Sequence, residues 1–282
     1  MQHFILTRFN LQLWPTDKRG RDIQRETDWL EERFRLFETF CLPSLRAQTC
    51  MDFDWVLLMD AETPQPWRER MEHWKAQMPQ LHPVWVPRPL HRQFPAVFQR
   101  LVSKHLHEGG QRVLTTYLDN DDALHRRFVE EVQRRAPGLQ GGTFLFFPHG
   151  LQYFTSLQLA TRIAYPNNHF CTLVEDYARP AQVRTVYGYG SHFLLHRNPH
   201  IPIHLATDAP PLWIEVVHER NVDNDVKMTL RTALIPSSRH LAEDFDLHLP
   251  YAKHPRLRFL SRFLLRAMRE MVRRARGKII CL

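Results

Sequence analysis

Residues 112–122 read Arg-Val-Leu-Thr-Thr-Tyr-Leu-Asp-Asn-Asp-Asp, a mainly apolar run that leads directly into three carboxylates. Such a run is typical of a buried central strand in a parallel sheet. In open α/β sheets, ligands bind beyond the carboxyl ends of the strands. The stretch therefore predicts a buried strand over 112–118 and a ligand site at Asp119, Asp121 and Asp122.

Apolar runs and amphipathic stretches alternate through the first 140 residues. This alternation predicts an α/β fold with a mostly parallel, Rossmann-like sheet flanked by crossover helices. Pro43 is expected to end or kink the first helix, since it has no N–H to donate. The expected strands are 4–7, 54–60, 84–86 and 112–118, and the expected helices are 29–45, 96–107 and 124–136.

The sequence pattern changes after residue 140, where short apolar runs are separated by Gly, Pro and Asn. This pattern predicts a half rich in strands and loops. We expect one continuous domain over 1–250, made of the halves 1–140 and 141–250, followed by an appendage over 251–282. Strand-like runs in the second half are 143–147, 151–154, 184–187 and 193–195.

Positive charge is concentrated at the C-terminus. Residues 253–278 hold ten Lys or Arg against one acid, a net +9 within a total of +8, so the remaining residues sum to −1. A neutral body without a recognisable nucleic-acid-binding pattern argues against nucleic acid as a partner.

The basic segment is periodic, with apolar and basic residues at steps of three or four. This pattern predicts an amphipathic basic helix. Such a helix over 254–282 can lie on an anionic membrane surface, or it can dock on the protein body through its apolar stripe. The stripe comprises Leu257, Leu260, Leu264, Met268, Met271 and Ala275.

Cysteine usage and hydropathy bear on where the protein resides. The four cysteines show no metal-type spacing, which favours reduced thiols in a cytoplasmic protein. The first eight residues contain too short an apolar run for a signal peptide, and no run of 18 apolar residues occurs. We therefore expect a cytoplasmic protein, either free or peripheral on the inner face of the plasma membrane.

The three carboxylates Asp119, Asp121 and Asp122, here called the aspartate cluster, have two interpretations. Clustered carboxylates repel one another unless a cation neutralises them, and Mg²⁺ or Mn²⁺ prefers oxygen ligands and bridges them to phosphates. The alternative is a polar turn in which Asp122 caps the following helix. A P-loop NTPase is excluded because its motif is absent.

Four stretches together resemble one enzyme family. The chain is similar, over most of residues 1–225, to the rhamnosyltransferase family of bacterial surface-polysaccharide loci, which are family-two-like glycosyltransferases of the GT-A fold. Residues 118–122 match that fold's Leu-Asp-x-Asp-Asp motif. The stretches are 3–10 (His-Phe-Ile-Leu-Thr-Arg-Phe-Asn), 40–45 with Gln48-Thr49, 55–60 (Trp-Val-Leu-Leu-Met-Asp) with Thr63-Pro64, and 118–122.

The resemblance implies a nucleotide-diphosphate sugar as donor and Mg²⁺ or Mn²⁺ as cofactor. The metal is expected on Asp119 and Asp121, with His218 completing its ligands, although one histidine among 17 can equally be a surface residue. Residues expected to contact the nucleotide sugar are Thr7, Arg8, Asn10, Asp60, Arg100, Asp119 and Asn120.

The resemblance also implies transfer with inversion, which requires a base on the acceptor hydroxyl. The acidic pair Glu175-Asp176 is the expected base, with Asp176 preferred, although acids also favour the first turn of a helix. We therefore expect a metal-dependent glycosyltransferase, its sugar a candidate rhamnose and its acceptor a surface-polysaccharide or lipid-linked glycan. The alternatives are an inactive protein of the same fold and a membrane-surface binding protein.

Overall fold

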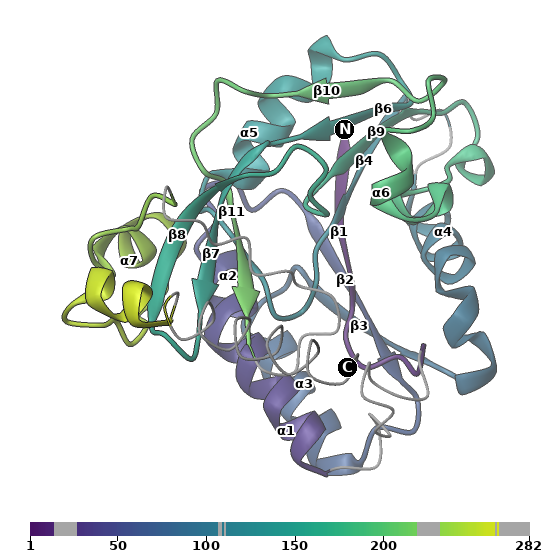
Figure 1. Ribbon diagram of the computed structural model, residues 1–282. Coiled ribbons are helices and arrows are strands. Elements are labelled where there is room, and N and C mark those ends of the chain that lie inside the picture. The colour runs from purple at the N-terminus through teal and green to yellow at the C-terminus, as the bar shows by residue number, and fades with distance from the viewer. Residues whose placement is uncertain (14–26, 107–108, 110, 219–231, 263, 265–282) are drawn as a thin grey trace, which may run out of the picture.

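Seven strands form the central sheet of the computed structural model, which describes residues 1–13, 27–106, 109, 111–218, 232–262 and 264 (Figure 1). The strand order is β10-β6-β9-β4-β1-β2-β3. All neighbouring pairs are parallel except those made by β9, which runs antiparallel to β4 and β6. The strands are β1 (Gln2–Arg8), β2 (Asp54–Asp60), β3 (Leu81–Val86), β4 (Arg112–Tyr117), β6 (Thr143–Phe146), β9 (Thr172–Asp176) and β10 (Ile203–Leu205).

A second sheet of four strands begins where β4 ends. Its order is β5-β11-β7-β8, and β5 follows the aspartate cluster directly. The cluster therefore lies in the connection between the two sheets. These strands are β5 (Ala123–Leu124), β7 (His149–Phe154), β8 (Leu159–Ala164) and β11 (Trp213–Val217).

Helices cover both faces of the central sheet (Figure 1). The strands are apolar on both sides, so alternate residues enter two cores. Trp55 and Leu57 of β2 pack with α1, α2, α3 and α5, whereas Val56 and Leu58 pack with α4 and residues 183–195. The helices are α1 (Thr27–Leu36), α2 (Leu42–Arg46), α3 (Gln65–Gln77), α4 (Phe94–His105), α5 (Phe128–Arg135), α6 (His192–Leu195) and α7 (Arg239–Phe245).

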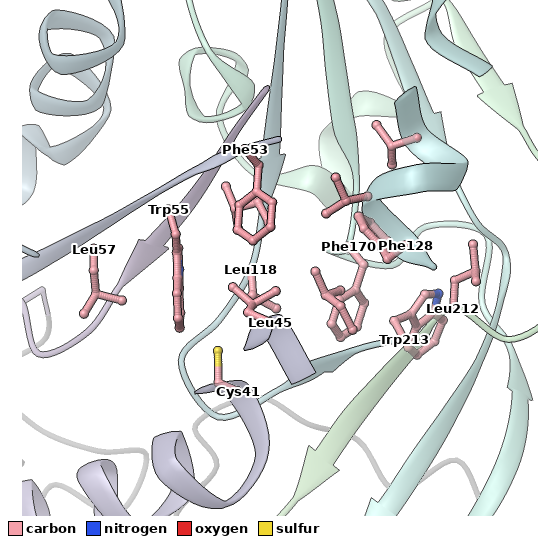
Figure 2. Close-up of a cluster of buried hydrophobic side chains, with 14 of the residues drawn as sticks. Cys41, Leu45, Phe53, Trp55, Leu57, Leu118, Phe128, Phe170, Leu212 and Trp213 are labelled. Carbon is pink, nitrogen blue, oxygen red and sulfur yellow. The ribbon is translucent and has the colours of Figure 1, made fainter. Parts of the chain in front are cut away.

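The first of these cores extends from the central sheet to the second sheet. Figure 2 shows part of this cluster, from Trp55 on β2 to Trp213 on β11. Both tryptophan side chains are fully buried, and each indole N–H donates a hydrogen bond, from Trp55 to Thr7 Oγ1 at 2.9 Å and from Trp213 to the Phe147 carbonyl at 2.7 Å. Buried aromatic rings with satisfied N–H groups thus join the two sheets.

The predicted α/β class with a mostly parallel sheet is confirmed. Most of the predicted elements have boundaries close to the observed ones. Pro43 does not end the first helix. The helical path from Thr27 to Arg46 contains a π-helical turn over Phe37–Cys41. Pro43 lies in the first turn of α2, where a missing N–H costs little.

Helix α5 begins only at Phe128, because residues 123–124 pair with β11.

Two strand predictions in the second half are wrong. Residues 186–189 form a 3₁₀ helix, and residues 192–195 form α6. Thr185 and Gly190 both have positive φ, at 66° and 79°, which interrupts extended backbone on either side of the 3₁₀ helix.

The C-terminal segment docks on the body, but not through its leucine stripe. Residues 255–262 are helical, and Phe259 is buried against Phe154 and Leu159. Leu257, Leu260 and Leu264 are exposed by 64%, 44% and 59%. For residues 255–262, the expectation that the apolar stripe packs on the protein body is therefore wrong. The rest of the basic segment, residues 265–282, and Cys281 lie outside the described residues.

In the part of the chain that the structure describes, no helix combines the length and hydropathy needed to cross a bilayer. Cys41, Cys50 and Cys171 are free thiols.

Candidate functional site

The carboxyl ends of four parallel strands meet at one edge of the central sheet. Arg8 ends β1, Asp60 ends β2, and Asp119 follows β4 with Leu118 between them. Residues far apart in sequence therefore lie close together at this edge, which is where open α/β sheets bind ligands. The three aspartates of the cluster each make a different set of contacts there.

Asp119 is paired with Arg8. Arg8 Nη2 lies 3.2 Å from Asp119 Oδ1 and also donates to the Tyr117 hydroxyl. The guanidinium centre lies 5.1–5.4 Å from the ring centroids of Phe94, Tyr117 and Tyr187. Its buried Nε has no hydrogen-bond partner among the described residues. Aromatic faces thus hold a cation at the strand edge with one donor group unused.

Asp121 is held by two basic side chains on the same oxygen. Its Oδ2 lies 2.9 Å from Arg33 Nη1 of α1 and 3.0 Å from His218 Nε2, which follows β11. Arg33 Nη1 also lies 3.3 Å from Asn120 Oδ1, and Asn120 donates to the Phe9 carbonyl. Although burial opposes ionisation, the charge of Arg33 and the hydrogen bond from His218 hold the pKa of Asp121 well below its usual range.

Asp122 ties the cluster to the second sheet. Its Oδ1 accepts the Val216 N–H of β11 at 2.8 Å, and its Oδ2 lies 2.7 Å from His169 Nε2. Burial raises the pKa of Asp122 to about 7 despite its histidine partner. Burial lowers the pKa of His169, but the hydrogen bond and charge of Asp122 outweigh this and raise it to about 9.

Charge in the cluster is balanced by the chain itself. Each aspartate has its own basic partner, and the partners come from three separate segments. The sequence argument required a cation beside these carboxylates and named Mg²⁺ or Mn²⁺, and the structure adds basic side chains of the chain as partners. The pairs are Asp119 with Arg8, Asp121 with Arg33, and Asp122 with His169.

Among the described residues, two sets of side chains could hold a divalent cation. Ligand atoms of Asp119, Asp122 and His169 lie within 4.8 Å of one another. Asp121 and His218 place an oxygen and a nitrogen 3.0 Å apart. Carboxylate oxygens suit Mg²⁺ and Mn²⁺, and imidazole is a common ligand of transition metals, so the donor types fit such an ion. Both oxygens of Asp122 are engaged, by Val216 and His169, and Asp121 Oδ2 is likewise engaged by Arg33 and His218.

The predicted nucleotide-sugar residues of β1 and β2 occupy the same edge, with different contacts. Thr7 is fully buried and accepts the hydrogen bond from Trp55, so it belongs to the core. Asn10 accepts the Asp60 backbone N–H at 2.9 Å and donates to Thr63 Oγ1 at 2.9 Å. These hydrogen bonds fix the loop after β1 against the end of β2.

Asp60 and Arg100 differ in position. Asp60 Oδ2 lies 3.2 Å from Arg88 Nε, and its Oδ1 accepts the Glu62 N–H at 2.8 Å. Arg100 is exposed on α4, and within the described residues no contact joins it to the aspartates. Asp60 therefore lies at the candidate site, whereas the structure does not bring Arg100 to it.

The predicted acceptor base lies at the opposite end of the sheet. Because β9 runs antiparallel to β4, Asp176 is opposite Arg112 at the start of β4, and their side chains pair at 2.6 Å. Seven residues of extended chain separate Arg112 from Asp119, roughly 20 Å. Glu175 accepts the backbone N–H groups of Arg184 and Thr185. The structure thus does not bring Glu175 or Asp176 to the aspartates, which corrects the expectation from sequence.

Sequence reasoning missed two residues of the site, His169 and Arg33. His169 belongs to a polar Asn-Asn-His run just before β9, and antiparallel pairing with β4 returns that run to the end of β4. Arg33 lies three residues after Leu30 and four before Phe37, on the margin of an apolar helix face. The sequence signal for Arg33 was therefore a basic side chain at the margin of a buried helix face.

Comparison with known proteins finds one family and several solved structures. A family model described as "Putative rhamnosyl transferase" matches residues 5–230. None of the curated proteins compared matches the chain. S. aureus TarS 1-349 is 10% identical at a TM-score of 0.38, with 77% of this chain and 60% of that chain covered. A putative nucleotide-diphospho-sugar transferase from Desulfovibrio desulfuricans G20 is 11% identical at a TM-score of 0.35, with 73% and 80% covered. This chain thus spans 60% of the length of the TarS 1-349 structure.

Proposed function

Because the chain belongs to the "putative rhamnosyl transferase" family, we propose that it is a GT-A-like glycosyltransferase that moves a sugar from a nucleotide diphosphate to a glycan acceptor. The observation that carries the proposal is the aspartate cluster at the carboxyl ends of the parallel strands, with a basic side chain on every carboxylate. Rhamnose as the sugar, and a surface-polysaccharide or lipid-linked glycan as the acceptor, are the finer parts of this proposal.

We assign the roles within the site from its contacts. Asp121 and His218 would hold Mg²⁺ or Mn²⁺, with Asp119 beside them. When bound, such an ion stabilises negative charge on the departing diphosphate. Arg8 directs its guanidinium toward the same edge, where it can contact a phosphate. Asn10 and Asp60 fix the loops around the nucleotide, and the Asp122–His169 pair anchors the cluster to β11.

We do not propose Glu175 or Asp176 as the base of an inverting transfer. Glu175 and Asp176 are bound to groups at the far end of β4, out of reach of a hydroxyl at the cluster. A base must lie within hydrogen-bond distance of the proton that it removes.

Calorimetric titration with dTDP, UDP and GDP, with and without Mn²⁺, tests the proposed function. We expect one nucleotide to bind with manganese and to bind at least about tenfold more weakly without it. His218→Ala should remove the manganese effect because it deletes a metal ligand. His169→Ala should retain it, since His169 is assigned to anchoring.

The two histidine variants form a matched pair. The reverse result, with the manganese effect lost only in His169→Ala, would move the metal to Asp119, Asp122 and His169. Absence of binding to all three nucleotides by the wild-type chain, with and without metal, would contradict a nucleotide-sugar donor.

We also propose that the exposed leucines of the C-terminal helix contact an anionic membrane surface. At 100° per residue, Leu257, Leu260 and Leu264 span about 60° of the helix, on the side away from the buried Phe259. Arg258 Nη1 donates to the Leu157 carbonyl at 3.1 Å, which helps fix the helix with its leucines outward. Exposed Lys253 and Arg256 supply complementary charge for anionic lipids.

Flotation with vesicles of phosphatidylcholine and phosphatidylglycerol tests this contact. Replacing the three leucines with serine should reduce binding at least about tenfold, because apolar area no longer leaves water. Leu194→Ser, at a residue 53% exposed on α6, is the matched control and should float like wild type. If the triple variant also floats like wild type, the leucine stripe is not the membrane contact.

A further inference from the structure

Among the described basic partners of the cluster, Arg33 is the one that comes from a helix outside the sheets. Its side chain is 14% exposed and makes a 2.9 Å contact with Asp121 and a 3.3 Å contact with Asn120. The guanidinium centre also lies 5.3 Å from the ring centroid of Trp29, one helical turn earlier. A face-on aromatic contact holds a guanidinium without using its N–H groups.

We propose that Arg33 serves two partners in turn, Asp121 when the site holds no donor and the donor's diphosphate when it does. This inference rests on the proposed function and makes Arg33 a positioning residue for the diphosphate. A guanidinium matches phosphate oxygens with two parallel N–H groups. The Trp29 contact would keep the guanidinium at the cluster while its hydrogen-bond partner changes.

Asp121 is not left unpartnered by this exchange. In the proposed function a divalent cation takes up this carboxylate together with His218, so Asp121 keeps a cationic partner when Arg33 leaves. The cost of an unsatisfied buried carboxylate is thereby avoided.

Charge balance couples the exchange to the divalent cation. Among the described residues each aspartate already has a basic partner, so a bound diphosphate adds negative charge that these partners do not compensate. Arg33 can leave Asp121 only where another cation takes up that carboxylate. Donor and divalent cation should therefore bind together, and Arg33 should oppose the binding of the cation alone.

Arg33→Gln tests the exchange through two binding constants that should move in opposite directions. By calorimetry, Mn²⁺ alone should bind about tenfold more tightly, because Asp121 loses a competing cation. The nucleotide that binds best among dTDP, UDP and GDP should bind about tenfold more weakly at saturating Mn²⁺. Arg33→Lys should recover part of the nucleotide affinity, since it restores the charge but not the paired N–H groups.

Arg35→Gln is the matched control on the same helix. Arg35 is 52% exposed and pairs with Glu32, so neither binding constant should change. If Arg33→Gln weakens Mn²⁺ and nucleotide together, Arg33 only shapes the site and the exchange is wrong. If it changes neither constant, the exchange is equally wrong. A wild-type chain that binds no nucleotide contradicts the proposed function itself, which separates the two failures.

Discussion

Asp121→Asn is expected to lower the metal-dependent release of dTDP from dTDP-rhamnose by roughly a thousandfold, if rhamnose is the donor sugar. The asparagine keeps the shape of the side chain and an oxygen for Arg33 and His218, so it removes mainly the negative charge. That charge is what would hold the divalent cation beside the diphosphate. The measurement is the steady-state rate with Mn²⁺, together with a thermal melt to show that the variant is folded.

Asp176→Asn is the matched control, because it makes the same change in an aspartate that sequence reasoning placed in the reaction. The side chain pairs with Arg112 at the start of β4, far from Asp121. We expect a rate within about twofold of wild type, since a surface ion pair contributes little to stability. A loss of rate in Asp176→Asn as large as that in Asp121→Asn would restore the acidic pair as the base and contradict the geometric argument.

Local patterns were sufficient to predict the central strands. Strands β1, β2 and β4 are continuous apolar runs bounded by polar residues, and their burial on both faces leaves that signal in contiguous sequence. Helix α3 was not predicted, because Met71 is its only side chain buried by more than nine-tenths and its other faces are polar. The π-helical turn before Pro43 depends on packing that no local pattern records.

The site was predictable only where it is contiguous in sequence. Asp119, Asp121 and Asp122 follow one strand, so a single motif revealed them. Their partners come from elsewhere: Arg33 is 88 residues before Asp121, and His169 is 47 residues after Asp122. The acidic pair at 175–176 was misplaced because the antiparallel direction of β9 cannot be read from its composition. Chain direction decides which end of a strand reaches the site.

Trp213 shows how the core supports this site. Its ring is fully buried and stacks on Phe170, with ring centroids 4.7 Å apart and an interplanar angle of 13°. Phe170 in turn contacts the His169 ring, with centroids 4.1 Å apart. Gly150 packs so closely against Trp213 that an added Cβ would lie 2.2 Å from the indole. Figure 2 shows Trp213 and Phe170 within the core cluster.

Trp213→Ala is therefore expected to lower the free energy of unfolding by about 3–5 kcal/mol, the range for deleting a large buried aromatic side chain. The truncation also leaves the Phe147 carbonyl without its indole donor and Phe170 without its stacking partner. Urea unfolding followed by circular dichroism measures the change. Trp85→Ala, at a half-buried ring that Arg68 covers at 4.3 Å, is the control and should cost less than about 2 kcal/mol. Equal losses in the two variants would mean that Trp213 does not anchor the core.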